Sequence, residues 1–103
     1  MERAIFINTP SSDDPGKAII QLEGNLDINQ ARFLKLKFDE LLTNYKNIEI
    51  LGTNIEYLDL SFIQLFQSFK NMAKKKRIEL VYHFHLEDDI FILLERAGIN
   101  INA

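Results

Sequence analysis

The sequence contains no cysteine and only four glycines and two prolines in 103 residues. Without cysteine, disulfide bonds and thiol chemistry are excluded, and a zinc site would have to rely on histidine and carboxylate ligands. The four glycines form neither Gly-x-Gly-x-x-Gly nor Gly-x-x-x-x-Gly-Lys-Ser/Thr, so we expect no glycine-rich loop that holds a nucleotide phosphate.

The chain also lacks an excess of positive charge and a long apolar run. Fifteen acidic and twelve basic side chains give a net charge of −3 and no basic stripe, which argues against a nucleic-acid partner. No signal peptide and no run of about 18 apolar residues is present, so no membrane insertion is expected. With 47% hydrophobic residues, the sequence predicts one complete cytoplasmic domain over residues 1–103.

Catalytic motifs are missing as well. No Gly-x-Ser-x-Gly occurs, and adjacent carboxylates such as Asp13 and Asp14 do not face a common substrate. His83 and His85 share a strand face, where Glu79 or Glu87 could join them around a metal ion. We interpret the two histidines as partly exposed residues of a polar strand face, and predict no metal and no cofactor.

Along the chain, segments in which apolar residues alternate as in a strand are followed by segments in which they recur at helical spacing. Asp27 and Asp59 each precede a helical pattern and are expected to cap it. We expect a turn-rich loop at residues 8–16, and Gly52 to Asn54 should end the third strand. The predicted strands are residues 4–7, 17–23, 47–51 and 78–85, and the predicted helices are residues 28–45, 60–77 and 86–97, the last closed by Gly98.

The helical core positions are read from their spacing. In the first helix they are Ile28, Ala31, Leu34, Phe38, Leu41, Leu42 and Tyr45; in the second, Phe62, Leu65, Phe66, Phe69, Met72 and Ala73; in the last, Leu86, Ile90, Leu93, Leu94 and Ala97. The basic run Lys74 to Arg77 then complements the C-terminus of the second helix.

The order ββαβαβα predicts an α/β domain with a mixed four-stranded sheet. Each strand–helix–strand step crosses over right-handed to a parallel neighbour, whereas the first two strands can pair antiparallel. One strand face is rich in Ile and Leu and the other is largely polar, so the helices should cover mainly one face. The polar positions are Lys17, Gln21, Glu23, Glu49, Glu79 and His83.

Two helices carry apolar residues outside their core stripes. Leu60 and Ile63 should face outward with Gln64 and Gln67 at the start of the second helix, and Phe33 and Leu36 should face outward on the first. Scattered exposed apolar residues are common in proteins. For Leu60 and Ile63 we favour a protein interface, because apolar and amide side chains at a helix start suit partner recognition.

Four segments in this order resemble a STAS domain of the anti-sigma-factor-antagonist type. They are Leu22-Glu-Gly-Asn-Leu-Asp27, Ile48-Glu-Ile-Leu51, Ile55-Glu-Tyr-Leu-Asp-Leu-Ser-Phe62 and Leu93-Leu-Glu-Arg-Ala-Gly-Ile99. The resemblance covers nearly the whole chain. It implies a STAS-like fold and a bacterial regulator of transcription that acts by binding another protein.

The resemblance also implies a site where an Asp-Ser-Ser-Gly motif opens the second helix. The first serine of that motif is phosphorylated by a partner kinase, which adds charge to the interface. Here Asp59 is followed by Leu60 in the place of that serine, Ser61 matches the second serine, and Phe62 replaces the glycine. We therefore hypothesise a permanent adaptor without this switch, while transfer of the phosphate to Ser61 remains an alternative.

The sequence thus predicts a non-catalytic adaptor that binds an anti-sigma factor or a sensor-type kinase, and leaves the oligomeric state open, including a homodimer. An alternative is a small subunit bound to the ATPase of a lipid-transport ABC complex. A third interpretation, an enzyme or ligand sensor, would rest on Asp27, Glu56 and Asp59. The predicted partner-binding residues are Asn54, Glu56, Asp59, Leu60, Ser61, Ile63, Gln64 and Gln67.

Overall fold

The computed structural model describes residues 4–10, 13–96 and 98 of the chain. None of the helices in these residues is long and apolar enough to cross a membrane. The elements, in chain order, are β1 (Ala4–Pro10), β2 (Lys17–Leu26), a 3₁₀ turn η1 (Ile28–Gln30), α1 (Ala31–Asn44), β3 (Asn47–Leu58), α2 (Leu60–Lys75), β4 (Glu79–Phe84) and α3 (Asp88–Arg96).

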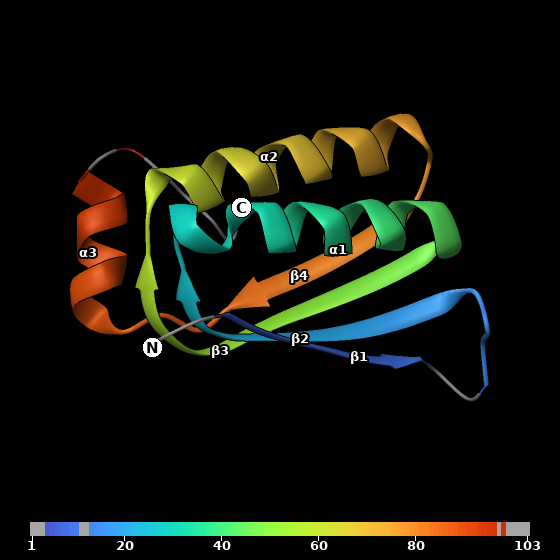
Figure 1. Cartoon of the computed structure of the whole chain (residues 1–103), viewed down its shortest axis with the longest axis horizontal. Helices are drawn as coiled ribbons and strands as arrows, with labels where there is room; N and C mark the ends of the chain where they lie inside the picture. Colours follow the sequence, from blue (N-terminus) through green and yellow to red (C-terminus); the bar gives the residue numbers. More distant parts are fainter. Residues whose placement is uncertain (1–3, 11–12, 97, 99–103) are drawn as a thin grey trace.

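The four strands form one mixed sheet in the order β1-β2-β3-β4. β1 runs antiparallel to β2, whereas β2, β3 and β4 are parallel. α1 and α2 lie side by side on one face of the sheet, and α3 lies at the end where β3 finishes and α2 begins (Figure 1). The predicted ββαβαβα order, mixed sheet and one-sided cover are confirmed.

The core is built on phenylalanine rings between the sheet and the two long helices. Phe38 of α1 stacks on Phe69 of α2, with ring centroids 4.5 Å apart. Phe66 packs edge-on against Phe84 of β4 at 5.2 Å. Phe38, Phe62 and Phe84 are almost completely buried. These contacts fix α2 against the sheet, so the start of α2 is held in one place.

The third strand is longer than its sequence pattern predicts. Gly52 does not end β3, because it lies directly under the ring of Phe84, where a Cβ would overlap that ring. Asn54 has a φ of 51°, which interrupts the regular strand for one residue, and Ile55 then turns back into the core. The segment preceding α2 is therefore a strand that reaches Leu58, and the prediction that Gly52 to Asn54 end the third strand was wrong.

The first helix begins later than its spacing predicts. Residues 28–30 form a separate 3₁₀ turn, so Ile28 lies off the core stripe and its side chain is 67% exposed. Its assignment to the core was wrong. The core position predicted for Met72 was also wrong, because Met72 lies on the side of α2 that faces α1 and is 41% exposed.

The bounds of β1, β2 and α3 differ by a few residues from the predicted ones. β1 continues to Pro10 into the expected loop, and β2 continues to Leu26. α3 begins at Asp88, after Leu86, and Gly98 follows it with a φ of +75°, as expected of a closing glycine. The Leu93 side chain, Ala97 and Ile99, which entered the predicted last helix and its motif, lie outside the described parts of the chain.

Candidate partner-binding site

Asp59 lies at the centre of the candidate site and joins two segments of the fold. Its Oδ1 accepts a hydrogen bond from the amide of Phe62 at 3.2 Å, which confirms the predicted helix cap. Its Oδ2 accepts a second hydrogen bond from the amide of Ile28 at 3.0 Å. Because both carboxylate oxygens hold backbone amides, Asp59 fixes the start of α2 against η1 and is a positioning residue.

Leu60, Gln64 and Gln67 form one exposed stripe along α2. At about 100° per residue, these positions fall within about 60° of one another and opposite the buried Phe62 and Phe66. Leu60 is 58% exposed, at the first position of the helix. We call Leu60, Gln64 and Gln67 the α2 stripe; it combines one apolar side chain with two amides.

Ser61 and Ile63 lie beside the α2 stripe and are only partly exposed. Ile63 packs against the core cluster, so its predicted outward position was wrong in part. The Ser61 side chain lies in the first turn of α2 and is also half-buried. Leu60 is thus the most prominent apolar group at the start of this helix.

The structure separates Asn54 from the α2 stripe. Asn54 Nδ2 donates a hydrogen bond to Glu23 Oε1 at 3.0 Å, and Gln21 donates to the other oxygen of Glu23 at 3.1 Å. Gln21 and Glu23 belong to the set of strand positions that alternates with the core, so this network lies toward the uncovered face of the sheet. Glu56 is exposed near the end of β3, closer along the chain to Leu60.

Two exposed side chains near Asp59 were missed by sequence reasoning. Ile28 follows the Asp27 cap, and its amide is bound to Asp59. Tyr57 is 52% exposed on β3, two residues before Asp59. It belongs to the part of β3 that lies beyond the predicted end of the strand. The apolar residues Ile55 and Leu58, both buried in the longer β3, would have been the signal.

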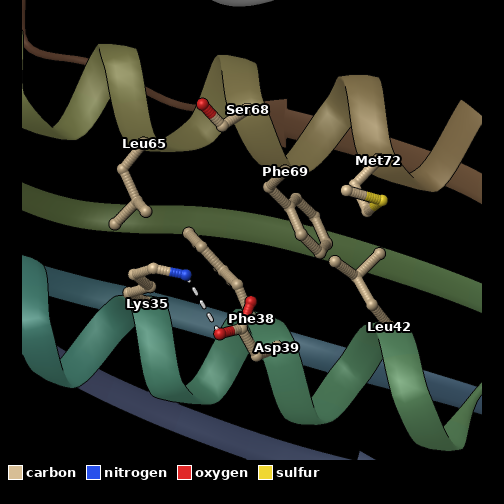
Figure 2. Close-up of a pocket in the computed structure, with 8 residues that line it drawn as sticks. All are labelled: Lys35, Phe38, Asp39, Leu42, Leu65, Ser68, Phe69 and Met72. Atoms are coloured by element: carbon tan, nitrogen blue, oxygen red, sulfur yellow. Dashed lines mark hydrogen bonds and ion pairs between the residues drawn. The ribbon is translucent and has the colours of Figure 1, made fainter.

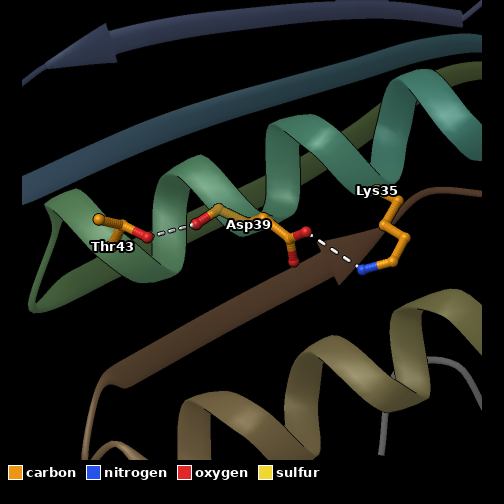
Figure 3. A network of polar contacts seen from close by, with 3 residues as sticks. All are labelled: Lys35, Asp39 and Thr43. Carbon is orange, nitrogen blue, oxygen red and sulfur yellow. Dashed lines mark hydrogen bonds and ion pairs between the residues drawn. The ribbon is translucent and has the colours of Figure 1, made fainter.

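A groove of about 250 Å³ opens between α1 and α2. Figure 2 shows Leu65, Phe69 and Met72 of α2 directed toward Phe38 and Leu42 of α1. At its rim Lys35 Nζ lies 3.1 Å from Asp39 Oδ2, and the Thr43 hydroxyl donates to the backbone oxygen of Asp39 at 3.0 Å (Figure 3). The charged groups at the rim of the groove therefore bind each other.

The sequence offered two alternatives to a protein-binding site: an enzymatic or ligand-sensing site and a metal site. Asp27 Oδ1 holds the amide of Asn29 at 2.9 Å, so Asp27, like Asp59, is a structural cap. His83 and His85 are exposed on β4 and just after it. Among the residues with a described placement, no three His, Asp or Glu side chains gather as a metal site would require.

Comparisons with known proteins show what this architecture resembles. No protein-family model and no curated protein matches the sequence. The fold is similar to an anti-sigma factor antagonist from Mycobacterium paratuberculosis, with a TM-score of 0.73 at 10% identity over 92% of this chain and 78% of that one. It is also similar to phosphorylated SpoIIAA of Bacillus, with a TM-score of 0.65 at 12% identity over 92% and 85% of the two chains.

A third similar structure is the STAS domain of an antisigma-factor antagonist from Rhodobacter sphaeroides, with a TM-score of 0.62 and 16% identity over 78% of this chain and 85% of that one. All three likenesses lie in the arrangement of strands and helices, because no more than 16% of the aligned residues are identical. The chain has the fold of STAS domains, as the resemblance implied.

Proposed function

We propose that this protein is a non-catalytic regulator that binds another protein through the start of α2, in the manner of an anti-sigma factor antagonist, in the cytoplasm of a bacterium. The observation that carries the proposal is the α2 stripe, in which Leu60 is 58% exposed on a helix start that Asp59 fixes in place. The solved structures of similar fold are named as antagonists of this type. Partner recognition commonly uses such an apolar centre with a polar rim.

The proposed contact surface comprises the α2 stripe, with Ser61, Ile63 and Glu56 at its margins, and leaves out Asn54, whose amide is bound to Glu23. Leu60 and Gln64 would make the central contacts, while Asp59 holds the helix start in position. The partner is an anti-sigma factor or a sensor-type kinase. The homodimer considered from the sequence stays a prediction.

We further propose that the contact is constitutive. Leu60 cannot accept a phosphate, and a leucine favours the apolar interface that a phosphate would disrupt. Ser61 is half-buried in the first turn, and Ser61→Ala should leave partner binding unchanged. Detection of a phosphate on Ser61 by mass spectrometry, together with loss of binding, would establish the alternative switch.

The test compares three baits in native cells: wild type, Leu60→Asp and Leu36→Asp. Leu36 is the matched control, because it is 60% exposed on α1 and lies outside the site. Proteins captured by wild type are identified and their affinities measured in purified pairs. Leu60→Asp should weaken binding to an anti-sigma factor or kinase at least about 30-fold, as expected when a hot-spot residue is lost, and Leu36→Asp should not.

Two results would contradict the proposal. Equal affinity of wild type and Leu60→Asp for the partner would show that the α2 stripe is not part of the interface. Capture of a transporter ATPase with the same dependence on Leu60 would keep the stripe but replace the regulatory role by that of an ABC-complex subunit.

A further inference from the structure

A dense group of cations lies at the end of the domain opposite the start of α2. We call the group the basic end: Lys46, Lys70, Lys74, Lys75, Lys76 and Arg77. Lys74 and Lys75 occupy the last turn of α2, and the amide of Glu79 bonds to the oxygen of Lys46 at 2.9 Å, which joins the start of β4 to the start of β3. In Figure 1 the end of α2 and the starts of β3 and β4 lie together, away from α3.

The basic end has few carboxylates with which to neutralise itself. The two ion pairs of the described chain both lie on α1, and neither includes a residue of this group. Glu79 is nearby along the chain, and Asp13 and Asp14 lie in the loop before β2, whose Gly16 oxygen accepts the amide of Lys46 at 2.8 Å. Asp14 Oδ1 accepts the amide of Gly16 at 2.9 Å. Lys70 is held over the ring of Tyr82, with its Nζ 5.0 Å from the centroid.

The helix dipole explains only part of this arrangement. It accounts for Lys74 and Lys75 in the last turn of α2. It does not account for Lys46, which lies in the connection between α1 and β3. Arg77 has a φ of 59°, a left-handed conformation that glycine adopts without strain and that commonly follows a helix. The chain keeps a long cationic side chain at a position where glycine would be more favourable.

We propose that the basic end binds the surface of an anionic lipid membrane. Successive residues from Lys74 to Arg77 leave the backbone in different directions, so a flat surface facing the helix end meets more of them than an extended peptide can. Clusters of four to eight Lys or Arg residues are the sequence feature typical of such binding.

The rest of the charge distribution orients the domain on that surface, although the net charge of the chain is −3. Asp27, Glu56 and Asp59 surround the start of α2, and Asp88 and Asp89 begin α3 at the same end of the molecule. An anionic surface repels these groups. α2 has 16 residues, so its start would stand about 24 Å from the membrane and remain open to a protein partner. The membrane proposal does not depend on the proposed function.

The test measures co-sedimentation of the full chain with phosphatidylcholine vesicles and with vesicles that also contain phosphatidylglycerol. We expect binding only to the second kind, and loss of binding as salt rises from about 0.1 M to about 1 M, where the Debye length falls from about 10 Å to about 3 Å. Each cation removed should weaken the partition about five-fold.

Two variants separate a lipid-binding role from a structural one. Arg77→Gly should fold at least as stably as wild type, since it relieves the left-handed conformation, and should still bind vesicles about five-fold more weakly. Lys74→Glu combined with Lys76→Glu should abolish binding. Its control is Lys35→Glu combined with Lys37→Glu, which changes the net charge equally but on α1, and which should retain most of the binding.

The proposal is overturned if phosphatidylglycerol does not increase binding, or if the α1 control loses as much binding as the basic-end variant. Binding of double-stranded DNA through the same lysines, without vesicle binding, would also overturn it and would replace the lipid surface by a nucleic acid. Leu60→Asp should bind vesicles like wild type, so failure of the partner site and failure of the basic end can be told apart.

Discussion

The carboxylate of Asp59 accepts a hydrogen bond from the backbone amide of Ile28 at 3.0 Å, across 31 residues of sequence. The same carboxylate caps α2 through Phe62. One side chain thus links the turn after β2 to the helix after β3. These two strands are parallel neighbours, and their last residues, Leu26 and Leu58, are paired. The geometry of the proposed partner site depends on this link.

Replacement of Asp59 should show both of its roles. Asp59→Ala removes two acceptors and should lower the free energy of unfolding by about 1–2 kcal/mol in a urea titration. Asp59→Asn should have a smaller effect, because its carbonyl oxygen can still cap the helix while its amide group faces the amide of Ile28. Asp27→Ala, which removes only the cap of η1, is the control and should cost less than Asp59→Ala.

Leu60→Asp should leave the fold intact. The residue is the first of α2, and an acidic side chain near a helix N-terminus contributes about 0.3–1 kcal/mol of favourable electrostatic energy. Thermal unfolding followed by circular dichroism should give a melting temperature equal to or above that of wild type. A marked decrease would mean that Leu60 supports the core, and loss of partner binding by this variant would then have a different cause.

Gly52→Ala should be destabilising although alanine is normally tolerated in strands. The new methyl group would overlap the Phe84 ring, and overpacking of this kind costs about 1–3 kcal/mol. Phe84→Leu should make room for it, so in a double-mutant cycle the two substitutions should cost less together than the sum of their separate effects. Additive effects would show that the ring moves aside freely.

Phe38 and Met72 both line the groove between α1 and α2, yet they should differ sharply in their contributions to stability. Phe38 is 1% exposed and stacks on Phe69, so Phe38→Ala should cost about 3–5 kcal/mol. Met72 is 41% exposed, and Met72→Ala should stay within about 0.5 kcal/mol. Chemical denaturation of the two variants measures these changes in the free energy of unfolding. Equal losses would show that Met72 is a core residue after all.

The ion pair of Lys35 and Asp39 should contribute little. Its side chains are 64% and 57% exposed, and pairs of this spacing on a helix surface contribute about 0.3–0.5 kcal/mol. Asp39→Asn should therefore change the unfolding free energy by no more than this amount at low salt. The difference should vanish at high salt, whereas a persistent difference would point to a role for Asp39 beyond the pair.

The sequence by itself determined the order of elements, the sheet, the covered face, and the caps at Asp27 and Asp59. Alternating and helical spacing carry that information locally, because each element must bury one face. It also identified the exposure of Leu60, Phe33 and Leu36, since these residues lie opposite a core stripe.

Only the tertiary structure decided how the ends of the elements meet. Gly52 reads locally as a strand breaker but continues β3 because Phe84 occupies the space above it. Ile28 reads as core until η1 turns it outward, and its amide then meets Asp59. Lys46 is far in sequence from the run Lys74 to Arg77, and becomes its neighbour because β3 and β4 pair in parallel and start together. Such relations depend on contacts between distant residues, which no local pattern contains.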